Sequence, residues 1–131
     1  MNFKLPHQPI EFEIPDLWWA AAGISGWKPH APSYVSTSDP QYPTTFVPLS
    51  EVAAPVRNKN VGWFQEQRMV DVLRGFRDGD KLPPIEVDEP PTNNGFRYRV
   101  RDGFHRYYAS AAVGFIQLLV SVRPYFDINA L

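Results

Sequence analysis

The sequence contains no cysteine among its 131 residues. The protein therefore has no disulfide, no thiolate nucleophile and no sulfur ligand for zinc or an iron–sulfur cluster, which excludes redox catalysis by a protein thiol. It has no apolar run close to the ~20 residues of a membrane span, because the longest run, 115–122, is interrupted by Gln117 and Ser121. The N-terminal residues lack the apolar block of a secretory signal, so we expect a cytoplasmic protein.

A strong net charge is also missing. The formal charge is −1, so no overall field attracts the chain to nucleic acid or to a membrane. The cations are nonetheless unevenly placed, with Arg97, Arg99, Arg101 and Arg106 close together. Arginine pairs with phosphate and carboxylate in a forked geometry, so the first three could form a nucleic-acid face; the alternative is a solvated strand face.

Composition divides the chain near residue 45. The first 50 residues hold eight of the 14 prolines, three of the four tryptophans and only two cations, Lys4 and Lys28. Proline at this density disfavours long helices and central strands, so we expect one short helix from Asp16, as N-cap, to Gly23, and otherwise an extended arm with turns. Its aromatic residues predict that the arm (1–45) packs on the domain formed by residues 46–131, where they either complete the core or bind a base or a partner.

The second part has regular patterns. Helical spacing of apolar residues predicts a helix over 63–77, and strict alternation predicts a strand over 96–101. Further patterns predict a strand-like lead-in at 46–52, a strand at 83–87, a helix at 105–113 and a last strand at 115–122. This order predicts a small α+β domain, a mixed β-sheet with flanking helices.

The candidate chemistry lies where the strand ends at Arg101 and the next helix begins near His105. The first N–H groups of a helix have no intrahelical partner, and the helix dipole adds positive charge there. Gly103 permits a close backbone approach, and His105 and Arg106 supply side-chain donors. The segment therefore predicts a phosphate site; the alternative is that His105 caps the helix and Arg106 pairs with Asp102.

These elements resemble the ParB/sulfiredoxin superfamily over about 80 residues. The matching segments are VPLSEV (47–52), the helix with EQRMVDVLRGF (66–76), LPPIEV (82–87), FRYRV (96–100), DGFHRYYASA (102–111) and FIQLLVSV (115–122). The ParB-type G-x-x-R-x-x-A box fits Gly103, Arg106 and Ala109, and the DG-x-HR form resembles free serine kinases of the superfamily, which have histidine where Phe104 stands.

The resemblance implies a ParB/sulfiredoxin-like fold that binds ATP or another nucleotide, with Mg²⁺ held through the phosphates. The residues that it assigns to the phosphates are Gly103, Phe104 (through its N–H), His105 and Arg106. Arg57 and Arg68 are weaker candidates: Arg57 could instead be an exposed loop cation, and Arg68 could lie on a solvated helix face.

Positions at which the sequence differs from the superfamily's motifs exclude some of the superfamily's activities. Phe104 occupies the position of the sulfiredoxin nucleophilic cysteine, so sulfiredoxin activity is excluded. Asp102 is the main candidate for acid–base work or for a Mg²⁺ ligand, with His105 beside it; alternatively Asp102 is a turn residue or the partner of Arg106. Glu51 and Glu66 are weaker candidate bases, and the three histidines form no metal-ligand pattern, so no metal site is expected from protein clusters.

Two classes of function remain at this stage. One is a nucleotide hydrolase or phosphotransferase, with a ParB-like nuclease or DNA-associated protein as a near alternative. The other is a non-catalytic regulator that binds a nucleotide or a protein partner. No membrane partner is expected.

Overall fold

The computed structural model describes residues 1–57 and 62–125. The predicted domain 46–131 thus includes two stretches, 58–61 and 126–131, that lie outside the described residues. In chain order the elements are β1 (Asn2–Lys4), β2 (Glu11–Glu13), α1 (Asp16–Ala21), β3 (Thr44–Pro48), the 3₁₀ turn η1 (Leu49–Glu51), β4 (Val52–Ala53), α2 (Glu66–Asp78), β5 (Ile85–Asp88), β6 (Tyr98–Asp102), α3 (Phe104–Val113) and β7 (Gln117–Val122).

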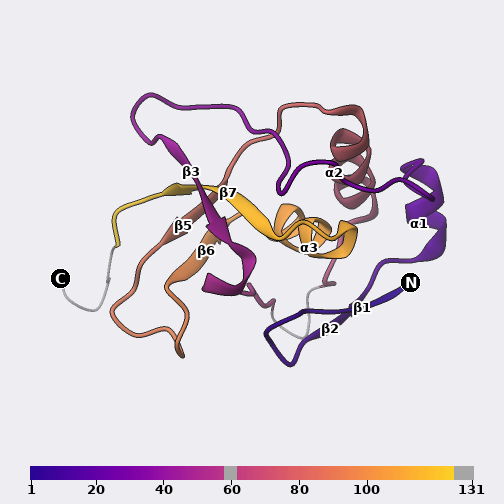
Figure 1. The fold of residues 1–131 in the computed structure, drawn as a ribbon. Helices are drawn as coiled ribbons and strands as arrows, with labels where there is room; N and C mark the ends of the chain where they lie inside the picture. The colour runs from indigo at the N-terminus through magenta and orange to yellow at the C-terminus, as the bar shows by residue number, and fades with distance from the viewer. Residues whose placement is uncertain (58–61, 126–131) are drawn as a thin grey trace.

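The main sheet has five strands in the order β3-β7-β5-β6-β4. Strand β5 pairs parallel to β7 and antiparallel to β6, β3 is antiparallel to β7, and β4 is parallel to β6. Helices α2 and α3 pack against each other beside this sheet (Figure 1). The predicted α+β class with a mixed sheet and flanking helices is confirmed.

Helix ends follow the local sequence. Gly79 and Gly114 have left-handed conformations directly after α2 and α3, as expected of glycine C-caps. The predicted N-cap of α1 is wrong by one residue: Pro15 is the N-cap and Asp16 is in the first turn. Proline at the start of a helix loses no hydrogen bond, because the N–H groups there have no intrahelical partner.

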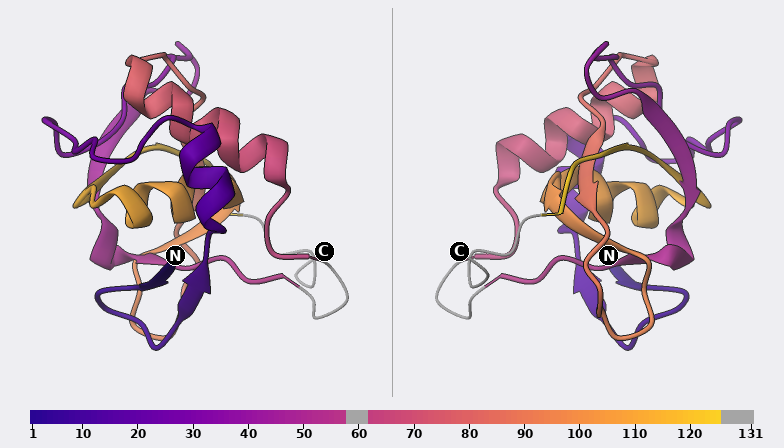
Figure 2. Two further views of the ribbon diagram at one scale, coloured as in Figure 1. Left: turned by 90° about the vertical axis from the view of Figure 1, so that its right-hand side faces the viewer. Right: turned by 90° about the vertical axis from the view of Figure 1, so that its left-hand side faces the viewer.

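The N-terminal arm is packed along the molecule. Its β1–β2 hairpin was not predicted, and Figure 2 shows α1 beside α2. The Gln8 side chain fastens the hairpin loop: Nε2 donates to Val52 O at 3.2 Å and Tyr107 Oη at 3.0 Å, and Ala54 N donates to Oε1 at 2.9 Å. Side chains of both parts form one buried cluster, including Leu5, Phe12, Ile14, Ile24, Tyr34, Leu73, Ile85, Tyr107 and Leu118.

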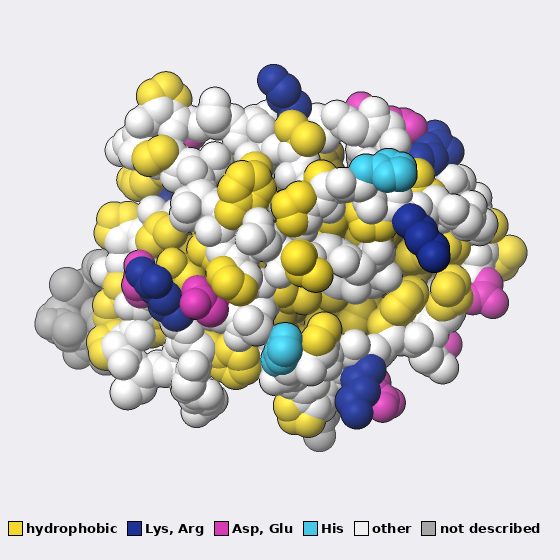
Figure 3. Space-filling view, in the orientation of Figure 1, with side chains coloured by type: hydrophobic (Ala, Val, Ile, Leu, Met, Phe, Trp, Pro, Cys, Tyr) yellow, Lys and Arg dark blue, Asp and Glu magenta, His cyan; other side chains and the backbone are white. Residues whose placement is uncertain are grey.

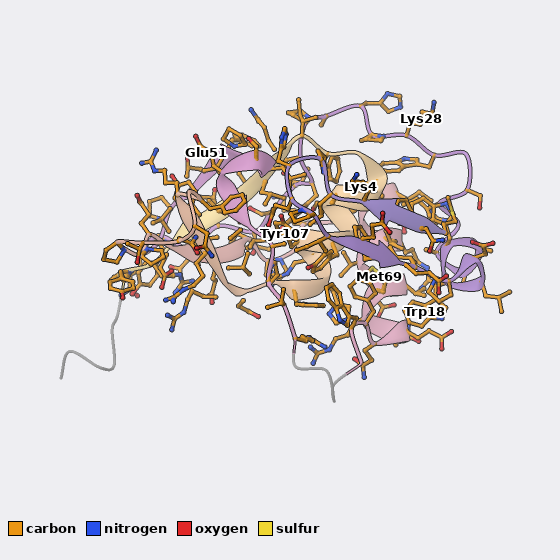
Figure 4. All side chains as sticks on the ribbon, turned by 90° about the horizontal axis from the view of Figure 1, so that it is seen from below. Lys4, Trp18, Lys28, Glu51, Met69 and Tyr107 are labelled. Carbon is orange, nitrogen blue, oxygen red and sulfur yellow. The ribbon has the colours of Figure 1, made fainter. Side chains whose placement is uncertain are left out.

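The arm's tryptophans are half-buried and pack against this cluster. Figure 4 shows Tyr107 near the middle of the molecule and Trp18 toward its outer side. Burial raises the pKa of the Tyr107 hydroxyl to about 12. Within the described ranges, no helix is long and apolar enough to cross a membrane.

Candidate functional site

Gly103 joins β6 to α3 with a backbone conformation that side chains disfavour. Its φ is 120°, and an added Cβ would lie 3.1 Å from Ile85 Cγ1 and 3.2 Å from Ile85 Cγ2. The residue is buried between the sheet and α3. Glycine is therefore required here by both the backbone angle and the available space.

The first turn of α3 offers unused backbone donors. The bond from Tyr107 N to Gly103 O, 2.9 Å long, is the start of the intrahelical series, and no side chain caps this end of the helix. The N–H groups of Phe104, His105 and Arg106 therefore have no partner within the helix, and the dipole makes this end positive.

These amides open into a pocket of about 270 Å³. It is lined by Arg57, Arg68, Asp71, Val72, Asp102, Gly103, Phe104, His105 and Arg106. Every residue that the sequence assigned to phosphate or catalysis thus lines one cavity, although they come from three separate segments. Glu51 and Glu66, the weaker candidate bases, are not among its lining residues.

Two arginines from other segments face the start of α3. The guanidinium carbon of Arg57 lies 4.1 Å from the centroid of the Phe104 ring, and Nη1 donates to Gly62 O at 3.5 Å. Arg68 is exposed on α2 and makes no hydrogen bond or ion pair within residues 1–57 and 62–125. The pocket thus has two cations that no carboxylate among the described residues neutralises.

The His105 side chain is hydrogen-bonded to the N-cap residue of the neighbouring helix, α2. Its Nε2 accepts a hydrogen bond from the backbone N–H of Gln65, the N-cap of α2, at 2.9 Å. Burial lowers the pKa of His105 to about 4, assisted by the positive charges of Arg57 and Arg68. The imidazole is therefore neutral, with its proton on Nδ1 and the lone pair of Nε2 in use. The lone pair that a base would use is therefore occupied in this structure, and the catalytic role of His105 stays a prediction.

Arg106 is held mainly by backbone carbonyls. Its Nη1 donates to Pro83 O at 2.6 Å and to Pro84 O at 2.9 Å, and Nη2 lies 3.5 Å from Asp102 Oδ2. The side chain is only 13% exposed. The alternative in which Arg106 pairs with Asp102 is thus observed, and three of the five N–H donors of the Arg106 guanidinium are in use.

Tyr34, from the arm, supports the same carbonyl. Its hydroxyl donates to Pro83 O at 2.8 Å. Burial raises the pKa of this hydroxyl, against a smaller opposing effect of the nearby Arg106 charge, so Tyr34 stays a neutral donor. The arm therefore helps to position the segment on which Arg106 rests.

Two carboxylates lie on the pocket. The Asp102 side chain is 69% exposed, and its contact with Arg106 is long. Asp71, on α2, is 57% exposed; it accepts a hydrogen bond from Gln67 Nε2 at 2.8 Å and lies 3.7 Å from Arg74. Oxygen ligands of this kind suit Mg²⁺, but the described residues contain no group of three or more metal-ligating side chains.

Asp71 was not among the site residues predicted from the sequence, although it lines the pocket. A signal was present, since Arg68, Asp71 and Val72 have i, i+3 and i+4 spacing and must share one face of a helix. What the sequence did not reveal is that this face is directed at α3.

The three arginines of the predicted nucleic-acid face, on β6 and just before it, lie beside carboxylates, and their binding to nucleic acid stays a prediction. Arg99 binds Asp88 through two hydrogen bonds of 3.1 and 2.8 Å, Arg101 binds the same carboxylate at 3.0 Å, and Arg97 pairs with Glu89 at 3.2 Å. The Asp88 side chain is fully buried. The register of β5 against β6 sets acids beside the arginines, so they do not form an unopposed row of positive charge.

Comparison with known proteins gives little further guidance. No family model matches the chain, and no curated protein matches it. Among solved structures it is similar to the C-terminally truncated chromosome-partitioning protein ParB from Caulobacter crescentus complexed with CTP-gamma-S, at 24% identity and a TM-score of 0.49. The match covers 65% of this chain and 46% of that chain, so this chain spans less than half of its length. A likeness of this size carries no conclusion about what this chain binds.

Proposed function

We propose that the pocket between β6, α3 and α2 binds the phosphate groups of a nucleotide. The observation that carries the proposal is the meeting of Arg57 and Arg68 with the uncapped start of α3 at Gly103. Backbone amides, a helix dipole and two arginines that pair with no carboxylate of residues 1–57 and 62–125 form an anion site. The ParB/sulfiredoxin-like sequence motifs support the same ligand, because in that superfamily the phosphates lie at this turn.

Each residue then has its own role. The amides of Phe104 and His105 and the guanidinium groups of Arg57 and Arg68 bind phosphate oxygens. His105 fixes the start of α2 relative to α3 through the Gln65 N–H, and Arg106 fixes the Pro83–Pro84 segment next to Gly103. The pocket volume of about 270 Å³ lies just below the range of about 300–1,000 Å³ of typical small-molecule sites, a size that suits phosphate groups.

Magnesium fits the carboxylates of this pocket. Asp102, with Asp71 across from it, supplies oxygen ligands, and the remaining ligands would be phosphate oxygens and water. The ion would neutralise phosphate charge. ATP with Mg²⁺ is the first ligand to test, and the base is to be identified by comparison.

A nucleotide titration with a matched arginine control tests the proposal. Isothermal titration with ATP, ADP, CTP and GTP, with and without Mg²⁺, should give saturable binding to at least one of them. Arg68→Ala should weaken it about 10–100-fold, the equivalent of a charged hydrogen bond of about 1.5–3 kcal/mol. Arg97→Ala, just before β6, removes the same charge outside the pocket and should leave the affinity unchanged.

Absence of saturable binding to a folded protein would overturn the proposal. Equal weakening by Arg68→Ala and Arg97→Ala would also reject it, because it would show binding to overall charge rather than to the pocket.

Hydrolysis or phosphoryl transfer is the second candidate. Of the two predicted catalytic groups, only Asp102 keeps exposed acceptor oxygens, since His105 Nε2 is occupied. As a general base, Asp102 would orient water or a hydroxyl group toward the phosphate. Phosphate release that falls about 10²–10⁴-fold in Asp102→Asn, with nucleotide affinity retained, would support catalysis. Saturable binding without turnover would instead indicate a non-catalytic regulator that binds a nucleotide.

A further inference from the structure

A second cavity, of about 290 Å³, lies at the C-terminal end of α2. One wall is formed by residues 75–80 of α2 and its cap, and the other by residues 27–35 of the arm together with Phe115. The phosphate pocket uses Arg68, Asp71 and Val72 of the same helix, so the two cavities share no lining residue. The proposed function gives this second cavity no role.

Aromatic side chains make its apolar wall. Tyr34, Phe76 and Phe115 are buried, and Phe76 contacts the other two at centroid distances of 5.1 and 5.2 Å. Trp27 is half-buried and lines the cavity, so part of its indole is open to a ligand. The Tyr34 hydroxyl is already bound to Pro83 O, and its ring is stacked on that of Phe76, which also lines the cavity.

The ionisable side chains around the cavity, besides Tyr34, are those of Arg77, Asp78, Asp80 and His30. Arg77 donates from Nε to Asp78 at 2.9 Å and from Nη1 to Gly23 O at 3.5 Å, so its charge is largely neutralised. Asp80 is exposed and has no ion-pair partner among the residues described here. The C-terminal end of α2 adds partial negative charge at the same place.

We infer that this cavity binds a small organic cation, an ammonium group carrying alkyl substituents. Aromatic rings attract such cations through their negative faces, and the alkyl groups gain by leaving water. The Asp80 carboxylate and the end of α2 hold the charge at the rim, while Trp27 and Phe115 contact the apolar part. Figure 3 shows that hydrophobic side chains occupy much of the face on which the arm crosses the molecule, with charged side chains mainly around them.

Choline and its uncharged isostere, 3,3-dimethylbutan-1-ol, test this inference. The two have the same shape and differ in charge. Titration followed by two-dimensional NMR should show saturable shifts at the Trp27 indole and at the amides of Ser33 and Asp80. A cation–π contact with an added carboxylate predicts that choline binds about tenfold more tightly than the alcohol.

Variants locate the cation. Asp80 is exposed, so Asp80→Asn should keep the fold and reduce the preference for choline over the alcohol, leaving only the part that the aromatic rings supply. Glu89→Gln removes one negative charge away from the cavity and should have no effect. Trp27→Leu should weaken both ligands.

Equal affinity for choline and the alcohol would overturn the inference and leave an apolar cavity. So would the absence of shifts at the cavity, or an equal loss of affinity in Glu89→Gln. Nucleotide binding is measured separately, at residues that this cavity does not contain, so neither result decides the other.

Discussion

His105 Nε2 accepts the backbone N–H of Gln65 at 2.9 Å, so one hydrogen bond joins the first residue before α2 to the first turn of α3. Both helices begin beside the phosphate pocket, so this hydrogen bond fixes the distance between Arg68 on α2 and the backbone amides of α3. The bond exists only while the imidazole is neutral, because a protonated imidazole has no lone pair to accept it.

This contact predicts a loss of stability in mild acid. The pKa of His105 is about 4 in the folded protein and 6.5 for an ordinary histidine, so the unfolded chain binds the proton first as the pH falls. The free energy of unfolding should therefore decrease between about pH 6.5 and 4, by at most about 3 kcal/mol, and this contribution should be complete above pH 6.5.

Urea unfolding at pH 7 and pH 4.5 measures this effect. His105→Gln lacks the titrating imidazole, so its free energy of unfolding should change less with pH than that of the natural protein. The carboxylates of the chain contribute equally to the pH dependence of both proteins. An identical pH dependence of the two proteins would contradict the role given to His105.

Gly103→Ala should be strongly destabilising. Gly103 has a φ of 120°, and the new methyl group would meet the Ile85 side chain at 3.1 Å. Backbone strain and overpacking together should lower the free energy of unfolding by about 2–5 kcal/mol. Gly26→Ala is the matched control, because Gly26 also has a positive φ, 78°, but nothing lies within 4 Å of the added Cβ. Thermal unfolding compares the two; equal losses would show that Ile85 does not limit the space at the turn.

Asp88→Ala should destabilise the sheet and change its surface. The substitution removes the buried carboxylate that Arg99 and Arg101 share. Because both guanidinium groups are nearly half exposed and can be hydrated, we expect a loss of about 1.5–3 kcal/mol, that of a hydrogen bond to a charged group. The variant should also bind DNA non-specifically more than the natural protein does, with an affinity that falls as salt is added.

The comparison uses Glu89→Ala, which removes the exposed partner of Arg97 and should leave stability nearly unchanged. Denaturant unfolding and DNA retention at two salt concentrations measure both effects. DNA binding by the natural protein as strong as that by Asp88→Ala would reject the view that Asp88 masks these arginines.

Gln8→Ala should loosen the arm. The substitution leaves Ala54 N–H without its acceptor and removes the donor to Tyr107 Oη, so we expect a loss of about 1–3 kcal/mol. Hydrogen exchange should become faster in the β1–β2 hairpin, with less change in α2. Gln41→Ala is the control, because the exposed Gln41 side chain makes a hydrogen bond only to Tyr42 Oη among the residues that the structure describes. Unchanged hairpin protection in Gln8→Ala would show that the hairpin is held by its apolar side chains alone.

The periodic part of the chain was predictable because its signals are local. Alternation over 96–101 anticipated β6, and helical spacing over 63–77 anticipated α2, although the helix begins later, at Glu66. The arm was harder, because proline density argued against strands while the short β1–β2 pair depends on contacts with the core. Such a pair is only marginally stable by itself, and the sequence does not display the surface against which it packs.

The sequence by itself determined the turn at 102–104, the helix that follows it and the absence of thiol chemistry, since these depend on residue types a few positions apart. Only the tertiary structure decided which partners the charged side chains have. The pairing of β5 with β6 brings Asp88 beside Arg99, the Pro83–Pro84 segment occupies Arg106, and the packing of α2 on α3 brings Arg68 to the pocket. An ion pair or a hydrogen bond forms only between groups that the fold brings within a few ångströms, and the order of residues along a chain does not specify that distance.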